Sequence, residues 1–499
     1  MHRILMRTLA VALGCALPLA GMAPATVASQ NLPSLGDTER QELSPVMERR
    51  LGEQIMRDIR RDRDFLGDAM LSEYLNNFGA ILVSSRPEVR GEAIYDYHFF
   101  AVRDPLLNAF ALPGGFIGVH SALILAAQTE SELASVLAHE IGHVAQRHIA
   151  RMLGQQRQDA LIPLASILLA ALAARSSPDV SAALIMGGEA AAIQRQLNFS
   201  RDAEREADRI GLQILREAGF DTSGMISFFS RLQTASRNHN DSAPAFLRSH
   251  PLTTERIADI EARTRDQRYR QRADSLDFHL IRARTRILQD DSANGLREAA
   301  QAFETQLEQK GRYQIAGAKY GLALIAYRQG DFTKAQALLQ EARAATGPSA
   351  KPNVVLTSLS IDLKLAANQA AEAVKEADAA RAQFPLSRGI AIQYADALLA
   401  ADRTDQAVRF LRDQAQLYRQ DQRLQDRLAK AYAAQGKQAL QHLALAESYA
   451  LAGSLPAALD QLSIARRASD ASFYDQALID ARERELRARY REELKEGRR

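Results

Sequence analysis

Hydrophobic positions recur every three to four residues along most of the chain, which predicts a mainly helical protein. A helical pattern covers residues 45–67. Residues 92–104 then alternate as a strand does, and residues 108–124 read as two strands joined by a turn at the Gly114-Gly115 pair. Helices are predicted after these strands. We therefore expect a first domain over residues 43–270 that is α+β, with more helix than sheet.

The chain after Asp274 is rich in helix-forming residues and contains similar segments. The segments QGDFTKA, ANQAAEA, ADRTDQA and AGSLPAA end at alanines that are 38, 34 and 51 residues apart. In each one a small or turn residue precedes the alanine by five positions, as where two short antiparallel helices meet. The spacing resembles the tetratricopeptide period and predicts an all-α repeat domain over residues 275–480. An irregular helical bundle is the alternative, because the bulky consensus positions are mostly absent. Residues 481–499 are predicted to form a charged, solvated helix.

The first residues have the pattern of a secretory signal peptide. A basic start is followed by an apolar run and a small-residue end, with cleavage expected after Ala25 or near Ala28, so we assign residues 1–29 to the signal and 30–42 to a linker. An uncleaved anchor is the alternative, although the run is shorter than a bilayer span. The only cysteine, Cys15, lies inside this segment. Lipidation there is a minor possibility, and export without disulfides favours the periplasm of a Gram-negative bacterium.

Composition is that of an ordinary globular protein. The 499 residues carry 63 basic and 60 acidic side chains, for a net charge of +3. This balance argues against nucleic acid as a partner. The length allows two or more domains, in agreement with the division above.

The sequence SVLAHEIGHVAQRH, residues 135–148, contains the strongest chemical signal. A capping box at Thr129 predicts a helix over residues 130–152. His139 and His143 then project from one face of this helix at the separation that one Zn²⁺ requires. Glu140 can hold and deprotonate a water molecule beside them. His148 is expected to point about 140° away, at 100° per residue, so we interpret it as a surface or partner-contacting histidine.

The surroundings of this motif favour a metal site over an accidental match. The neighbouring residues are apolar, so uncompensated histidine and glutamate side chains would be costly. Gly142 lies between the two histidines and costs the helix about 1 kcal/mol relative to alanine. A close approach of another backbone at this point would explain the glycine.

A third protein ligand is expected from the sequence FSRDAEREADRIG further along the chain. Glu204 and Asp208 are four residues apart on a second amphipathic helix. Such a pair can supply one metal ligand and one carboxylate that orients a ligand imidazole. Glu206 is a competing ligand that periodicity does not separate from Glu204. An ordinary charged helix face is the remaining alternative.

These two motifs together resemble the zinc metallopeptidases related to the CAAX-processing and heat-shock membrane proteases. The resemblance implies a zincin-type fold, one Zn²⁺ per chain, Glu204 as the third ligand and Glu140 as general base. Asp208 is counted with the catalytic residues but is expected to act on a ligand rather than on the substrate.

The same resemblance extends to two further segments. It implies that a strand at Asn108, Ala109, Phe110 and Ala111 pairs with an extended substrate. It also implies that His250, in RSHPLTTERIAD, approaches the zinc as a fourth ligand and holds the resting enzyme inactive. A plain loop histidine is the alternative for His250. Arg256 is expected to pair with a carboxylate near the site.

Signal peptide, protease domain and helical repeats together resemble the periplasmic members of this family that act in outer-membrane β-barrel assembly. The resemblance implies a gluzincin-like zinc endopeptidase that degrades misassembled outer-membrane proteins and assists their assembly, with repeats that bind the β-barrel assembly machinery or the client. The alternatives are a chaperone or scaffold with little proteolysis and a general periplasmic oligopeptidase. Residues 160–194 are apolar and are expected to form a hairpin that covers the cleft or touches a membrane, or else an ordinary pair of core helices.

Overall fold

The computed structural model describes residues 44–91, 96–154, 200–238, 246–247, 250–265, 272–309 and 311–496. The predicted signal peptide, the linker and the apolar segment 160–194 lie outside the described residues, so those expectations stay predictions. Within the described ranges, no helix combines the length and the apolar character needed to cross a membrane.

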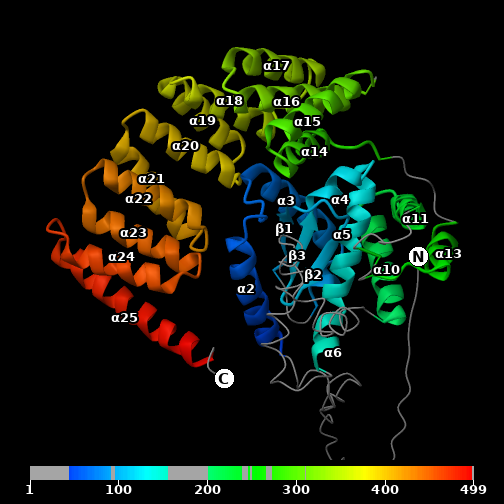
Figure 1. Cartoon of the computed structure of the whole chain (residues 1–499), viewed down its shortest axis with the longest axis horizontal. Helices are drawn as coiled ribbons and strands as arrows, with labels where there is room; N and C mark the ends of the chain where they lie inside the picture. The colour runs from blue at the N-terminus through cyan, green and yellow to red at the C-terminus, as the bar shows by residue number, and fades with distance from the viewer. Residues whose placement is uncertain are drawn as a thin grey trace, which may run out of the picture.

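The N-terminal part combines helices with one small sheet (Figure 1). It begins with α2 (Pro45–Arg61), α3 (Ala69–Ser85) and the short 3₁₀ helix η1 (Pro87–Arg90). The sheet consists of β1 (His98–Val102), β2 (Ala109–Leu112) and β3 (Phe116–His120) in the order β1-β3-β2, with β1 parallel and β2 antiparallel to β3. The predicted strand, turn and strand are confirmed, and both glycines of the turn have positive φ, 78° at Gly114 and 89° at Gly115.

The two outer edges of this sheet differ in their hydrogen bonding: neighbouring segments bond the edge at β1, whereas the edge at β2 faces a helix. Along β1, the side-chain amide of Asn76 bonds both the N–H and the C=O of Phe99, at 3.1 and 2.7 Å. The N–H of Leu66 bonds the C=O of Ala101 at 3.0 Å. Along β2, Asn108 accepts from the N–H of His120, so alternation in an antiparallel pair turns Ala109 and Ala111 toward the outer edge. That edge faces helix α5 (Glu130–Ala145).

Helices α5 and α10 (Arg201–Glu217) cross at very short range. A β-carbon on Gly142 would lie 2.9 Å from the carbonyl oxygen of Ala207, and one on Gly211 would lie 3.2 Å from the backbone nitrogen of His139. The glycine between the two histidines is therefore explained by the close backbone approach that the sequence suggests. The other helices that the structure describes in this part are α4 (Ser121–Ala126), α6 (His148–Gly154), α11 (Ser223–Asn238) and α13 (Thr254–Thr264).

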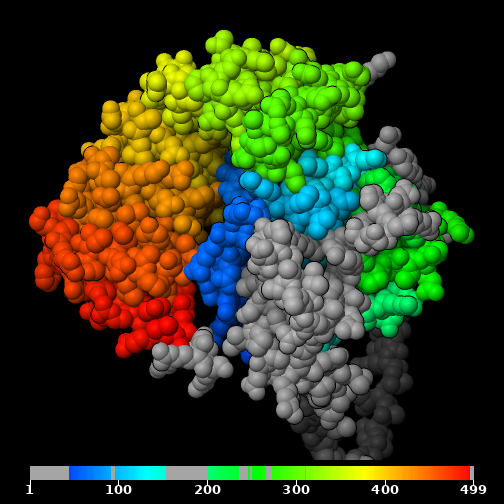
Figure 2. All heavy atoms as spheres, viewed as in Figure 1, coloured from blue at the N-terminus to red at the C-terminus, as the bar shows by residue number. Residues whose placement is uncertain are grey.

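The C-terminal part is entirely helical within the described residues and curves round the N-terminal part, with α2 between them (Figures 1 and 2). Its helices are α14 (Leu276–Gln289), α15 (Ala293–Leu307), α16 (Arg312–Arg328), α17 (Phe332–Ala345), α18 (Val354–Ala366), α19 (Ala370–Gln383), α20 (Arg388–Ala400), α21 (Thr404–Leu417), α22 (Gln422–Ala434), α23 (Gln438–Leu451), α24 (Leu455–Arg467) and α25 (Phe473–Glu496). The expected fold class is confirmed: a mainly helical α+β part is followed by an all-α, solenoid-like part.

Each segment found in the repeats contains a residue with left-handed backbone geometry at a turn between helices. These residues are Gly330, Asn368, Asp402 and Gly453, with φ of 79°, 57°, 56° and 75°. The alanine that ends each segment is fully buried where the two helices pack. A fifth turn of this kind, at Gly436 with φ of 71°, joins α22 to α23 and precedes the buried Ala439. The sequence comparison missed it, which explains the long last spacing.

The last helix differs from the expectation. Helix α25 begins at Phe473 rather than near residue 481, and it is not a free solvated helix. Ile479 and Leu486 are buried in a cluster with α23 and α24. The many charges of this segment conceal its apolar stripe in the sequence.

One hydrophobic cluster extends from α3 and α5 through α14 to α18, so the two parts share a core. A polar contact accompanies it: Arg284 on α14 binds both carboxylate oxygens of Asp68, at 2.7 Å each, and donates to the hydroxyl of Tyr320 at 2.8 Å. Asp68 is also the N-cap of α3. Burial opposes the charge on Asp68, but Arg284 outweighs it and lowers the pKa of this carboxyl below 3.8.

We expect Arg284→Met to destabilise the folded chain by about 3–5 kcal/mol at neutral pH, because Asp68 would remain buried without its partner. A carboxyl with a lowered pKa contributes stability that is present above its unfolded pKa and lost as the pH falls through the folded value. The difference from the parent chain should therefore shrink below about pH 3.8. Urea unfolding of both chains at neutral pH and below pH 3.8 checks this. An equal difference in the free energy of unfolding at the two pH values would contradict it.

Candidate metal centre

Helix α5 carries the two histidines of the HEIGH motif. Its N-terminus is capped as predicted, since the Thr129 hydroxyl accepts from the N–H of Glu132 at 3.2 Å. Its C-terminus is not where the pattern placed it: the helix ends at Ala145 instead of residue 152. Arg147 adopts φ of 52° and α6 starts in a new direction at His148. The predicted orientation of His148 assumed one continuous helix and is wrong for that reason.

Four side chains converge in a fully enclosed position. One ligand atom from each of His139, His143, Glu204 and His250 lies within 4.8 Å of the others, and all four residues are buried. Nε2 of His143 lies 3.0 Å from Nε2 of His139. The carboxylate oxygens of Glu204 lie 3.5 Å from Nε2 of His139 and 3.4 Å from Nε2 of His143. Nδ1 of His250 lies 2.9 Å from Glu204. Among the described residues, the sequence thus named every member of this group.

Asp208 and Arg256 support the group from α10 and α13. Oδ1 of Asp208 lies 3.0 Å from Nδ1 of His139, on the side away from Nε2. Arg256 binds both oxygens of Asp208, at 2.7 and 2.8 Å, and approaches Glu204 to 2.8 Å. This contact fits the expectation for Arg256. Burial opposes the charge on Asp208, but His139 and Arg256 outweigh it and lower its pKa.

The electrostatics of His139 show what a cation would replace. Burial disfavours a charged ring, but the carboxylates of Asp208 and Glu204 outweigh burial and raise the pKa of His139 to about 10. Without a metal ion, the group therefore holds a proton at neutral pH. A divalent cation must displace that proton, as is usual where metal ligands have to be deprotonated.

His143 is oriented by a residue to which the sequence gave a different role. Nδ1 of His148 lies 2.8 Å from Nδ1 of His143, and Nε2 of His148 lies 3.2 Å from Glu206. Burial lowers the pKa of His148 to about 4, more than Glu206 raises it, so the ring is neutral at pH 7. A neutral His148 that donates to Glu206 accepts from Nδ1 of His143, which leaves Nε2 of His143 free to bind a metal. Glu206 therefore lies behind His148 and outside the four-residue group.

We expect His148→Ala to weaken zinc binding by roughly 10- to 100-fold, because His143 would lose the contact that fixes its tautomer and ring orientation. Competition between the protein and a chelator of known affinity measures this. His442→Ala, in the repeat helices and bonded to Gln461 at 2.8 Å, is the control and should bind zinc as the parent does. Unchanged zinc affinity in His148→Ala would show that His148 does not orient His143.

Glu140 lies beside the same position, with one carboxylate oxygen 3.5 Å from Nε2 of His250. It is fully buried, and neither carboxylate oxygen has a hydrogen bond of ordinary geometry among the described residues. Burial raises its pKa, while His250, His139 and a contact with the backbone N–H of Ala111 on β2 oppose this effect. A buried carboxylate held only by such long contacts is suited to take up a proton from a ligand.

Phe246 and His250 both contact His139 of α5, and Phe246 also contacts the residues that lead into β2. Phe246 stacks on His250 with ring centroids 4.7 Å apart, and its N–H donates to the C=O of Leu107 at 3.0 Å. Nε2 of His250 lies 3.5 Å from Glu140. Leu107 directly precedes the four residues predicted to bind substrate, of which Ala109 and Ala111 present their backbone groups to this side.

The donor set fits zinc. Two imidazoles, a carboxylate and a third imidazole are nitrogen and oxygen ligands of the kind that Zn²⁺ prefers, with neighbouring carboxylates fixing the rings. The unbonded Glu140 beside them is the base that such a site requires.

Fold and site together define a zinc metalloendopeptidase. Residues 85–264 match the model of peptidase family M48, which covers η1, the sheet and the four-residue group. These peptidases are zinc-dependent. A fission yeast relative, the mitochondrial metalloendopeptidase OMA1 of Schizosaccharomyces pombe, is 32% identical over 39% of this chain and 55% of its own length.

Other relatives match nearly the whole chain, among them two bacterial proteases. The beta-barrel assembly-enhancing protease of Escherichia coli (strain K12) is 33% identical over 98% of both chains, and that of Yersinia pestis is 33% identical over 91% of both. The chain therefore belongs to the family of beta-barrel assembly-enhancing proteases.

Proposed function

We propose that this metalloendopeptidase acts in the periplasm, where it degrades misassembled outer-membrane β-barrel proteins and assists their assembly. The name of the relatives, matched along both parts of the chain, supports the role in barrel assembly. The N-terminal pattern of a signal peptide supports export. The curved array of helix pairs is the kind of surface by which solenoids bind other proteins, here the barrel assembly machinery or the client.

The buried group is the observation that carries the proposed chemistry. His139, His143 and Glu204 would hold Zn²⁺. When bound, zinc supplies a Lewis acid that polarises the scissile carbonyl and activates water. The Glu140 carboxylate takes the proton from the attacking water and passes it to the leaving amine nitrogen. Asp208 holds His139 through Nδ1, and His148 holds His143, so neither ring turns during the reaction.

The outer edge of β2 would bind the substrate as an added strand. Ala109 and Ala111 offer backbone N–H and C=O groups there, while Asn108 and Phe110 bond β3 and support the edge from behind. Main-chain pairing accepts many sequences, which suits a protease that removes unfolded chains of varied composition.

His250 and Phe246 would restrain the enzyme. His250 occupies a position in the ligand group, close to Glu140, and Phe246 bonds the start of the same strand edge. One segment thus blocks both the coordination position and the substrate strand. Release of this segment would open both together.

We expect His250→Ala to raise casein cleavage by several-fold without changing zinc content, because three protein ligands remain. Cleavage by the parent, by His250→Ala and by His279→Ala, a buried histidine of the repeat helices, is compared at equal zinc loading. Equal or lower activity in His250→Ala would contradict the restraint.

The same preparations test the biological role against its alternatives. The proposal expects an unfolded outer-membrane β-barrel protein to be cleaved and the same protein, once folded in detergent, to be spared. Rapid cleavage of short peptides with no action on the unfolded barrel would favour a general oligopeptidase. Binding of the unfolded barrel with no cleavage by the zinc-loaded His250→Ala variant would favour a scaffold.

A further inference from the structure

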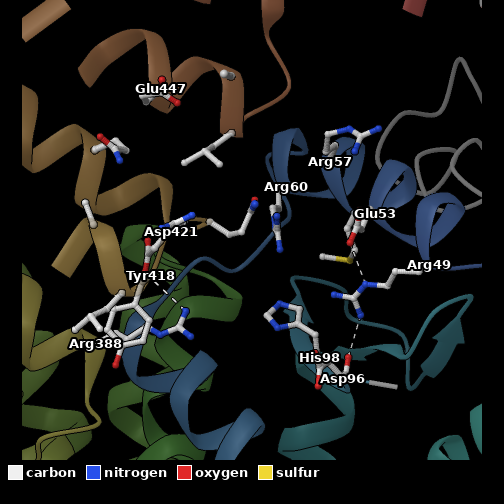
Figure 3. A pocket seen from close by; sticks show the side chains of 18 of the residues that line it. Arg49, Glu53, Arg57, Arg60, Asp96, His98, Arg388, Tyr418, Asp421 and Glu447 are labelled. Carbon is white, nitrogen blue, oxygen red and sulfur yellow. Dashed lines mark hydrogen bonds and ion pairs between the residues drawn. The ribbon is translucent and has the colours of Figure 1, made fainter. Parts of the chain in front are cut away.

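A cavity of about 890 Å³ lies between α2, the start of β1 and the repeat helices (Figure 3). None of its lining residues belongs to the metal centre. On one wall are Arg49, Arg57 and Arg60 of α2, and on the other are Arg388 and Tyr418. The cavity therefore lies where the two parts of the chain meet, and none of its residues takes part in the proposed proteolysis.

The arginines of this cavity are not matched by its acids. Seven lining residues are arginines and five are aspartates or glutamates. Four of the acids have arginine partners of their own: Glu53 with Arg49 at 3.0 Å, Asp421 with Arg423 at 3.0 Å, and Glu447 and Glu485 with Arg482 at 2.6 Å each. Arg388 lies 4.0 Å from Asp421, which Arg423 already pairs. Three lining arginines, Arg57, Arg60 and Arg419, form no ion pair within 4.0 Å among the described residues and remain to receive an anion.

The charge is concentrated at one point. Figure 3 shows the Arg60 side chain extending from α2 into the space between the two walls, toward His98. Burial, with Arg60, Arg388 and Arg49 adding to its effect, lowers the pKa of His98 to about 4. The ring is therefore neutral at pH 7, and its surroundings favour negative charge.

The walls also carry aromatic and apolar surface. The Arg49 guanidinium lies 4.6 Å from the ring centre of Phe116, and that of Arg388 lies 4.6 Å from the ring centre of Tyr418. Leu417 is 71% exposed at the rim. Arginine stacked on an aromatic ring can present its edge for bidentate contact with a carboxylate. The edge of Arg49 already donates to Glu53 and to the C=O groups of Asp96 and Gly114, so Arg388 is the stacked arginine that can make this contact.

We propose that this cavity binds an acidic segment of an unfolded polypeptide, with a carboxylate held between Arg60 and Arg388. A free phosphate matches the arginines but leaves the aromatic walls unused. A polypeptide also brings N–H groups, and these can donate to the carboxylate of Asp96, the lining acid with no arginine ion pair among the described residues. The volume suits a short peptide stretch. The inference goes beyond the proposed function, since binding here needs neither zinc nor cleavage.

The test measures peptide binding to the full chain carrying Glu140→Gln, so that cleavage plays no part. Fluorescence anisotropy compares a labelled peptide rich in glutamate and phenylalanine with the same peptide carrying glutamine for glutamate. We expect the acidic peptide to bind at least about tenfold more tightly, with the preference falling at high salt.

Arg60→Gln and the double variant Arg60→Gln/Arg388→Gln should each weaken this binding, the double variant by about tenfold or more. Arg60 makes no polar contact with a described residue, so its replacement leaves the fold intact. Arg50→Gln, an exposed arginine of α2 outside the lining, is the matched control and should bind as the parent does. Equal binding of both peptides, unchanged binding in the double variant, or displacement of the acidic peptide by millimolar phosphate would each overturn the proposal.

Discussion

Glu140→Gln is expected to reduce casein cleavage by roughly 10²- to 10⁴-fold, the usual contribution of a general base, while zinc content stays at the parent level. The amide matches the carboxylate in shape but cannot take a proton. The carboxylate has only long contacts, with Nε2 of His250 at 3.5 Å and with the backbone of Ala111, and an amide oxygen can still accept from both, so we expect the fold to be retained.

The matched control for this variant is Glu206→Gln, on the neighbouring helix behind His148. It removes a carboxylate near the site that is not expected to touch the substrate, and it should retain most of the activity. Cleavage that survives in Glu140→Gln at full zinc content would show that another group acts as the base.

Arg256→Met is expected to destabilise the metal-free chain by about 3–5 kcal/mol, because Asp208 and Glu204 would stay buried without their shared cation. Part of this loss should be recovered when zinc is added, since the cation supplies positive charge to the same carboxylates. Urea unfolding of chelator-treated and zinc-loaded protein measures both effects.

Arg263→Met is the control for that comparison. Arg263 lies on the same helix and pairs with Asp259 at 2.7 Å, but both side chains are largely exposed. Such surface pairs contribute at most about 1 kcal/mol. Equal losses of stability in Arg256→Met and Arg263→Met would show that the buried contact of Arg256 stabilises the chain no more than an exposed ion pair.

Much of the site could be predicted because its residues lie a few positions apart on single helices. Two histidines four residues apart share a helix face whatever the tertiary fold, and a glycine between them indicates a close neighbour. The contact of Gly142 with Ala207 is that neighbour. The assignment of Glu204 over Glu206 needed the family resemblance, because periodicity does not separate the two.

Other features depend on backbone turns that residue patterns do not reveal. Helix α5 ends because Arg147 takes a left-handed conformation, a rare choice for a residue with a side chain, and this turn brings His148 back to His143. The turn at Gly436 follows Asp402 by 34 residues, but it was overlooked because glutamine, Gln441, stands five positions after it where the other segments have alanine. The bond from Phe246 to Leu107 joins segments far apart in the chain, which no local pattern records.

The central claim is that His139, His143 and Glu204 hold one zinc ion on which proteolysis depends. The most direct measurement is the zinc content of purified parent chain and of His143→Ala, by elemental mass spectrometry after dialysis against a weak chelator, with casein cleavage followed in the same samples. The account predicts one zinc per chain and cleavage in the parent, and neither in His143→Ala. Stoichiometric zinc in His143→Ala, or cleavage by a parent chain that contains no metal, would contradict it.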